Sequence, residues 1–361
     1  MLKSTEKTAQ LNEGALPTNV SSSLVSDPGT GNATVGDRVR QILQRGGSSW
    51  TFGILVLLLI AFGLISHSFF SQANWIATST YATEYVLVGV GETFVIITGG
   101  LDLSVGGILA LSGMTAAWVM NSSSVRTLPI WLILVLGVLV GMAIGVLVGF
   151  INGVIVTRLK IAPFIVTLGT LSIATGIVEL ANAGQPIVGV PSPMGTFGIF
   201  NLGGWIPDTV LVTAVVVVIA GLVLAKTRFG LRTYGIGSSA EAARRHGVNV
   251  DRHLVKVYAV SGLFAGIAGL IVLSRFGEAT PLAGQNDNLN AIAAAVIGGA
   301  SLFGGIGTIF GTVIGAFVLS VLVTGLVIAN MNPFWQPVAV GFVLIVAVFL
   351  DQLRKRIGDR S

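Results

Sequence analysis

The stretch Pro129–Gly153 (PIWLILVLGVLVGMAIGVLVGFING) contains no charged residue over a length that can cross a lipid bilayer. An α-helix rises about 1.5 Å per residue, so about 20 apolar residues cross a hydrocarbon core of about 30 Å. Similar apolar segments recur on both sides of it, and we predict further spanning helices over 50–68, 82–99, 103–120, 162–182, 208–225, 254–274, 288–301, 305–329 and 334–350. The expected fold is an all-α polytopic membrane protein with about ten transmembrane helices.

The composition also indicates a membrane protein. Of the 361 residues, 53% are hydrophobic and only 10% are charged, whereas soluble domains carry about 25% charged residues. So few charges argue against an ordinary cytosolic enzyme, which needs them to cover its surface. The chain has 48 glycines, a residue that lets membrane helices pack closely. The absence of cysteine excludes disulfides, cysteine-zinc sites and thiol nucleophiles.

The basic residues predict the orientation of the chain. With the N-terminus in the cytoplasm and ten helices alternating, 18 of the 20 Lys and Arg residues fall on the cytoplasmic side, and only Arg126 and Arg275 fall outside it. This partition follows the positive-inside rule. We therefore expect both termini in the cytoplasm. The net charge of +5 is then an orientation signal, and no nucleic-acid partner is expected.

Three regions follow from these patterns. Residues 1–49 are rich in Ser, Thr, Asn and Gly and predict a largely disordered cytoplasmic tail. Within this tail, 35–45 forms either a short amphipathic helix at the membrane lipid or an extension of the tail. Residues 50–350 form the transmembrane domain, which contains a long cytoplasmic loop at 226–253, and residues 351–361 form a basic cytoplasmic tail.

The loop 226–253 carries the signature of a short helix. Ser238 and Glu241 have the spacing of a capping box, in which each side chain bonds the other residue's backbone amide. Gly247 can end the helix in the left-handed conformation. The residues of this element are Ser238, Ser239, Glu241, Ala242, Ala243, Arg244, Arg245 and Gly247. A capped short helix between two membrane spans suggests a docking element for a cytoplasmic partner.

The same loop contains Gly235–Ala240 (GIGSSA), which matches the dinucleotide-binding pattern G-x-G-x-x-A. Such a site needs a preceding strand and a βαβ unit, which are not expected here, so we interpret Gly235 and Gly237 as turn residues. No lysine follows a glycine, which excludes a P-loop and thus ATP hydrolysis by this chain. The three histidines do not pair with acidic residues at metal-ligand spacing, so no enzyme activity is expected.

Carboxylates within the apolar segments are candidates for function because a charge in the bilayer is costly. Glu92 lies in the middle of a predicted helix, where it belongs either to a structural network or to a translocation pathway. Glu84 and Glu179 lie near outer helix ends, where solvated or interfacial positions explain them.

Two glycine-rich segments predict broken helices near 99–107 and 298–305. Asp102 lies in the first segment (GGLDLSVGG), where it either caps the next helix or belongs to a break that turns backbone groups toward a polar solute. The second segment (GGASLFGG) is a loose echo of the first and suggests a duplicated element. In the alternating topology both breaks lie on the cytoplasmic side.

Three motifs together resemble the permease subunits of ribose-type sugar ABC importers, a family that includes xylose-, fructose- and galactose-type permeases. The motifs are Gly99–Gly107, Gly235–Val250 (GIGSSAEAARRHGVNV) and Ala291–Gly307 (AIAAAVIGGASLFGGIG), in the expected order. The resemblance extends from about Trp50 to Arg356 and thus covers nearly the whole membrane part of the chain.

The resemblance implies a multi-pass protein of the bacterial inner membrane, related to the vitamin B12-type importer architecture. It implies a second permease copy, a homodimer in the simplest case, together with cytoplasmic ATP-binding subunits and a periplasmic sugar-binding protein. ATP and Mg²⁺ would bind to the partner ATPase, and no cofactor is expected in this chain. Ser238–Gly247 would be the coupling helix that contacts the ATPase.

The resemblance does not identify the residues that contact sugar, for which neutral hydrogen-bonding or aromatic groups suit better than charge. The candidates for the translocation pathway are Glu92, Asp102, Ser104, Asn152, Phe164, Thr167, Asn288 and Asn290, with Asn182 as a further one. Packing or a helix end is the alternative explanation for each. Relatives usually have Glu-Leu-Asp where this chain has Asn288-Leu289-Asn290, so a role there would depend on hydrogen bonding.

Two rival functions remain at this point. One is an ABC permease for branched-chain amino acids or nucleosides, and the other is a secondary carrier that works without ATP. Dependence on a partner ATPase separates the secondary carrier from the ABC permeases.

Overall fold

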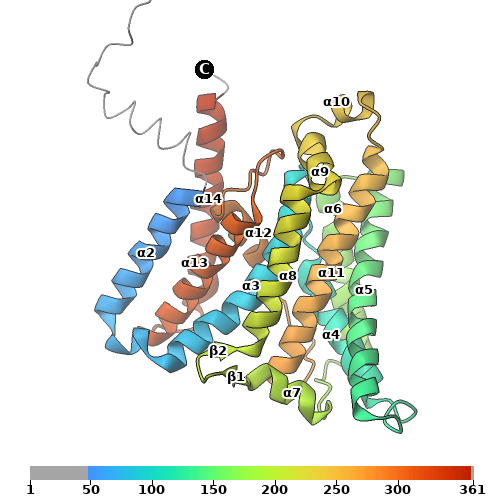
Figure 1. Cartoon of the computed structure of the whole chain (residues 1–361), viewed down its shortest axis with the longest axis vertical. Helices are drawn as coiled ribbons and strands as arrows, with labels where there is room; N and C mark the ends of the chain where they lie inside the picture. Colours follow the sequence, from blue (N-terminus) through green and yellow to red (C-terminus); the bar gives the residue numbers. More distant parts are fainter. Residues whose placement is uncertain (1–47, 359–361) are drawn as a thin grey trace, which may run out of the picture. The chain divides into compact units, whose positions relative to one another are not determined.

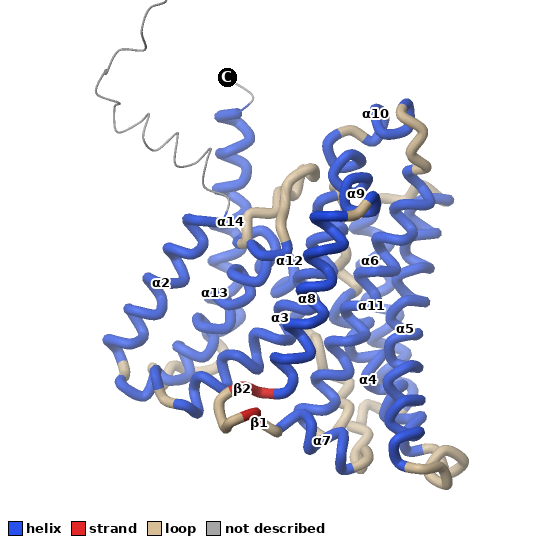
Figure 2. The backbone as a smooth tube through the Cα atoms, in the orientation of Figure 1, coloured by secondary structure: helices blue, strands red, loops and turns tan. Residues whose placement is uncertain are grey.

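The computed structural model describes residues 48–358 (Figure 1), and helices make up most of that range (Figure 2). The helices that match the predicted segments are α2 (Ser48–Ile65), α3 (Gln72–Ile97), α4 (Val105–Asn121), α5 (Ile130–Arg158), α6 (Pro163–Ala181), α8 (Asp208–Lys226), α11 (Val250–Phe276), α12 (Asp287–Ile297), α13 (Ile309–Ile328) and α14 (Trp335–Gly358). The connecting elements are η1 (His67–Phe70), α7 (Ser192–Ile199), α9 (Arg228–Ser238), α10 (Ala240–Arg245) and the antiparallel strands β1 (Asn201–Leu202) and β2 (Ile206–Pro207). The helix expected over 35–45 lies outside the described residues.

Seven helices of the described range are long and apolar enough to cross a membrane: α3, α5, α6, α8, α11, α13 and α14. The helices α2, α4 and α12 are apolar but shorter. α12 has 11 residues and so extends about 16 Å, roughly half of the hydrocarbon core. The spanning helix predicted over 288–301 is therefore too long, because the left-handed Gly299 ends α12.

α3 begins at Gln72, well before the predicted start at 82. Ser71 caps the helix by accepting a hydrogen bond from the Asn74 amide at 3.3 Å. Thr, Ser and Tyr lower the hydropathy of its first turns, but Thr78 pairs with Thr324 of α13 at 2.9 Å. Contacts with the neighbouring helix thus stabilise a segment that hydropathy alone does not assign to the membrane.

α5 packs against α11 through glycines that recur every fourth residue. A Cβ on Gly149 would overlap the carbonyl oxygen of Tyr258, and a Cβ on Gly153 would lie 2.6 Å from the Cα of Val255. One turn earlier in α5, Gly145 faces Gly262 in the same way. Because lipid tails are as apolar as the helices themselves, close van der Waals packing is what holds such helices together.

The two predicted breaks have the same geometry. Gly99 and Gly299 have φ angles of 81° and 94°, and their amides donate to the carbonyls three residues earlier at 2.8 and 2.9 Å. In each break the next amide donates five residues back, at 3.1 Å in the first and 2.9 Å in the second, which completes a Schellman cap. The similarity between the two glycine-rich segments therefore extends from their sequence to their backbone geometry. The Gly305 N–H also donates to the Ile97 carbonyl at 2.8 Å, so the breaks lie together.

The described helices have two distinct ends in Figure 1. α9 and α10 lie at the end where α2 begins and α14 finishes, whereas α7 and the β1–β2 hairpin lie at the opposite end. The described range thus starts and finishes at the end that carries α10.

We expect Gly149→Ala to lower the thermal midpoint of the detergent-purified protein. The added Cβ forces α5 and α11 apart, and overpacking of this kind costs about 1–3 kcal/mol. Gly221→Ala in α8 is the matched control, because nothing lies within 4 Å of a Cβ there. Equal midpoints for the two variants would contradict the glycine interface.

Candidate functional site

A network of fully buried polar side chains lies where α3 ends and α4 begins. Asp102 Oδ1 accepts hydrogen bonds from the Ser104 amide at 3.0 Å and from the Ser104 hydroxyl at 2.5 Å. Its Oδ2 accepts from the hydroxyl of Ser261 on α11 at 2.9 Å, and its own amide donates to Glu92 Oε1 at 3.1 Å. Asp102 thus pairs the amide and hydroxyl of Ser104, which is itself the N-cap of α4, so the expectation that Asp102 caps this helix was wrong because it lies two residues too early.

The network continues into α5 and α6. Asn152 Nδ2 donates to the Ser104 hydroxyl at 2.8 Å, and the Thr170 hydroxyl donates to Asn152 Oδ1 at 2.6 Å. The Thr167 hydroxyl lies 3.0 Å from the Pro163 carbonyl within its own helix and 3.3 Å from the Leu101 carbonyl of the first break. The structure thus brings together five of the predicted pathway residues in the interior, namely Glu92, Asp102, Ser104, Asn152 and Thr167.

Two members of this network, Ser261 and Thr170, were not recognisable in the sequence. Each is a hydroxyl residue within an apolar helix that carries at least one other Ser or Thr. Only the packing of α11 and α6 against the first break distinguishes these two.

A cavity of about 460 Å³ lies between α4, α6 and the segment 281–285. Its polar lining consists of Ser172, Thr175 and Glu179, which share one face of α6, and Gln285. The first turn of α4 borders the cavity with its glycines at 106 and 107. The volume is that of a small-molecule site, and hydroxyl and amide groups suit a neutral polar solute. Glu179 is exposed, as expected for an outer helix end.

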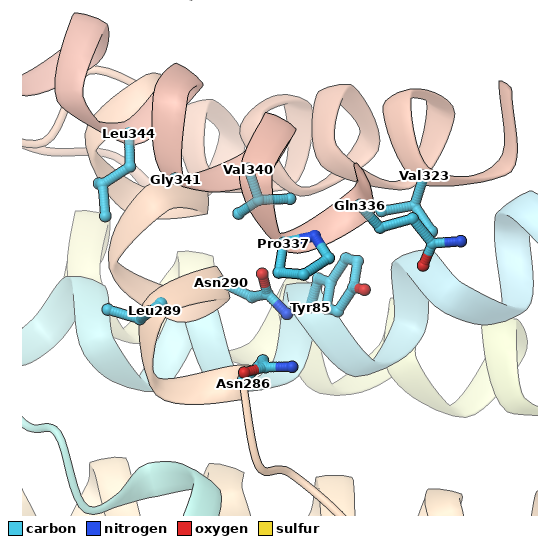
Figure 3. A pocket seen from close by; sticks show the side chains of 10 residues that line it. All are labelled: Tyr85, Asn286, Leu289, Asn290, Val323, Gln336, Pro337, Val340, Gly341 and Leu344. Carbon is cyan, nitrogen blue, oxygen red and sulfur yellow. The ribbon is translucent and has the colours of Figure 1, made fainter. Parts of the chain in front are cut away.

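A smaller cavity of about 100 Å³ lies between α3, α12 and α14 (Figure 3). Figure 3 shows the Asn286 and Asn290 amides and the Tyr85 ring on one side of it, facing Pro337 and Gln336 of α14. Asn290 is buried, and its Nδ2 donates to Asp287 Oδ1 at 3.1 Å.

The remaining predicted residues lie apart from these sites. Asn288 accepts a hydrogen bond from the Leu289 amide at 2.9 Å and does not line the smaller cavity. Phe164 is half exposed on α6. Asn182 follows α6, and its Nδ2 donates to the Gln185 carbonyl at 2.8 Å, which fits the helix-end explanation.

Glu84 is not solvated, contrary to expectation. Its carboxylate lies 3.6 Å from the Arg275 guanidinium, and the Glu84 side chain is only 13% exposed. The guanidinium also lies 4.2 Å above the ring of Tyr81. The expectation was wrong because α3 begins at Gln72, which places Glu84 within the helix and against α11.

The short helix predicted within the loop 226–253 is confirmed as α10, with a correction at its start. Ser239, not Ser238, caps it and accepts a hydrogen bond from the Ala242 amide at 3.2 Å, because Ser238 still belongs to α9. The capping box does not form, since Glu241 pairs with Arg245 instead.

The end of α10 follows the prediction. Gly247 is left-handed with φ of 80°, and its amide donates to the Arg244 carbonyl at 2.9 Å. Gly235 and Gly237 are not turn residues but lie inside α9. The long loop expected at 226–253 is therefore mostly helical.

We expect Asp102→Ala to lower the thermal midpoint more than Asp102→Asn. Alanine leaves the Ser104 amide and the Ser261 hydroxyl buried without an acceptor, at a cost of about 1–3 kcal/mol. Asparagine keeps one oxygen acceptor and nearly the same volume. Equal losses in a thermal unfolding experiment would show that the Asp102 hydrogen bonds do not stabilise the break.

Comparisons with known proteins identify the family to which the sequence is similar. A family model described as "Branched-chain amino acid transport system / permease component" matches residues 74–348. The ribose import permease protein of Bacillus subtilis is 39% identical over 300 residues, which cover 82% of this chain and 90% of the relative. No solved structure gives a significant match.

Two further relatives transport other sugars according to their names. The D-allose transport system permease protein of Escherichia coli is 37% identical and covers 84% of this chain and 91% of its own length. The galactose/methyl galactoside import permease protein of Salmonella typhimurium is 36% identical, and the alignment covers 84% of this chain and 94% of the relative. With a family match over most of its length and relatives aligned almost end to end, the chain belongs to this family of transport-system permease components.

Proposed function

We propose that the chain is the membrane-spanning subunit of an ATP-driven importer for a pentose or hexose in the bacterial inner membrane. The observation that carries the proposal is the alignment over more than four fifths of the chain with permeases named for ribose, allose and galactose import. The chain itself then transports and does not catalyse, and ATP and Mg²⁺ bind to the partner subunit.

The larger cavity favours a sugar over the rival substrates. The family description names branched-chain amino acids, whose carboxylate calls for a cationic partner, yet no Lys, Arg or His is among the residues that line this cavity. A nucleoside base calls for an aromatic stacking partner, and the lining contains no aromatic residue. Ser172, Thr175 and Gln285 instead offer the neutral hydrogen bonds that sugar hydroxyls need.

A second copy of the chain completes the pathway in this proposal. α6 is long enough to cross the membrane, yet Ser172 and Glu179 are exposed on it. Ser172 lies near the middle of α6, where a polar side chain is more favourable beside water than against lipid, so this face of α6 fits a water-lined path between two copies better than contact with lipid. Phe164 is half exposed in the first turn of the same helix. Ten passes of the chain with both termini in the cytoplasm, as in the vitamin B12-type importers, complete the proposed topology, with the short α12 and the segment before it together forming one pass.

α10 is the proposed contact with the ATPase. All its residues but two are exposed, and Ala243 anchors it in a buried apolar cluster with Ile236 of α9 and Val250 of α11. Closure of the ATPases on ATP would move α10 and switch the pathway between its outward- and inward-facing states. The sugar-binding protein delivers the sugar on the opposite side, so the permease needs only a weak site.

Replacement of Glu241 and Arg244 by Ala should abolish sugar-stimulated ATP hydrolysis, while the protein still reaches the membrane. The measurement uses proteoliposomes with the partner ATPase, the binding protein and radiolabelled ribose, allose or galactose. The expected loss is at least ten-fold because the docking surface is removed. Uptake driven by an ion gradient without any ATPase would overturn the importer proposal.

Ser172→Ala and Thr175→Ala should each reduce uptake in the same assay about five-fold, since a lost hydrogen bond costs about 1 kcal/mol. Ser122→Ala, in the exposed connection after α4, is the control. Unchanged uptake in both cavity variants would show that the larger cavity is not part of the sugar pathway.

A further inference from the structure

Three stretches of backbone meet at the end of the molecule that carries α10, with almost no side chains between them. They are the end of α3, the end of α9 and the loop 298–308 that joins α12 to α13. The Gly305 N–H donates to the Ile97 carbonyl at 2.8 Å, and this bond links the two helix breaks. Gly237 of α9 packs on the bond itself. A Cβ on Gly237 would overlap the Ile97 oxygen and lie 2.5 Å from the Gly305 nitrogen.

The loop side of this junction is also built from glycine. Gly304 has a φ of 84°, and a Cβ on it would lie 3.0 Å from the Gly237 oxygen and 3.1 Å from the Gly99 nitrogen. Only glycine combines this backbone conformation with such close approach. The contact is therefore backbone against backbone, and no side-chain rotamer is available to absorb a displacement of α9.

Tyr234 adds a directional link between α9 and the same loop. Its hydroxyl donates to the Gly307 carbonyl at 2.6 Å. Burial raises the pKa of the Tyr234 hydroxyl, so it stays protonated and able to donate at neutral pH. On the other side of the loop, Asp351 of α14 accepts from the Ser301 hydroxyl at 3.2 Å and from the Leu302 amide at 3.3 Å. The loop is thus held between α9 and α14.

α9 is joined closely to α10. Ser239 is at once the residue that ends α9 and the cap of α10, so no linker separates the two helices. The buried cluster of Ile236, Ala243 and Val250 holds both helices against the start of α11. A displacement of α10 therefore moves the end of α9 and, with it, Gly237.

We propose that Gly237 and Tyr234 are positioning residues that transmit a displacement of α10 to both helix breaks. The inference rests on the proposed function, in which α10 contacts the ATPase. The first break leads through the Asp102 network into the start of α4, which borders the larger cavity. The second break ends α12, whose Asn290 lines the smaller cavity. One movement of α9 thus acts on elements that line both the larger and the smaller cavity.

The test compares Gly237→Ala with Gly235→Ala, a control in the same helix where nothing lies within 4 Å of the new Cβ. Tyr234→Phe is the second variant, because it removes one hydroxyl and adds no volume. Each is assembled with its ATPase and binding protein in proteoliposomes, and sugar uptake per ATP hydrolysed is measured with radiolabelled ribose, allose and galactose.

We expect Gly237→Ala to lower uptake per ATP at least ten-fold and Tyr234→Phe to lower it about three-fold, with ATPase binding and basal hydrolysis retained. Gly235→Ala should match the unmodified complex. A normal ratio in both test variants overturns the inference, and so does a parallel loss of assembly, hydrolysis and uptake, which indicates a structural role only. Failure of the unmodified complex to couple uptake to ATP instead refutes the proposed function.

Discussion

The constraint on which the structure depends is the pairing of backbone groups away from water. Inside a bilayer, an unpaired N–H or C=O costs several kcal/mol, so a chain can leave the helical conformation only where the protein supplies partners. Here α3 and α12 both end in Schellman caps that pair their last carbonyls, and the Gly305 amide pairs the Ile97 carbonyl between the two breaks. Asp102 then pairs the Ser104 amide at the start of α4. The helices can be interrupted here because the backbone N–H and C=O groups freed at each break find hydrogen-bond partners within the protein.

Close approach of the helices follows from glycine, and it serves two purposes in this chain. Between α5 and α11, Gly145 and Gly149 face the opposite backbone, so the helices gain van der Waals contact where lipid provides no hydrophobic driving force. At the end that carries α10, Gly237 and Gly304 remove the side chains between α9 and the breaks. The first contact stabilises the helix pair, and we propose that the second transmits movement. The high glycine content of the sequence thus has two separate structural origins.

The candidate sites form a continuous series through the protein. α10 presents exposed charged residues at one end, where Arg244 and Asp251 form an ion pair at 3.4 Å. The breaks and the buried Asp102 network follow, and the larger cavity begins at the first turn of α4. A buried, hydrogen-bonded polar network next to a cavity lined by hydroxyl groups suits a transporter, because the solute must bind weakly and leave again. The exposed polar face of α6 points to the same path.

Local sequence was sufficient to locate most of the apolar helices, since hydropathy acts over a few neighbouring residues, but it missed the start of α3, the helix α9 and the residue that caps α10. It predicted the helix breaks near 99–107 and 298–305, the left-handed Gly247 and the existence of α10. Tertiary structure decided the rest. Asp102 meets Ser261 across 159 residues of sequence, and Glu84 meets Arg275 because packing extends α3 beyond its apolar run. Such pairings depend on which helix faces lie together, and a periodic apolar sequence carries almost no information about that choice.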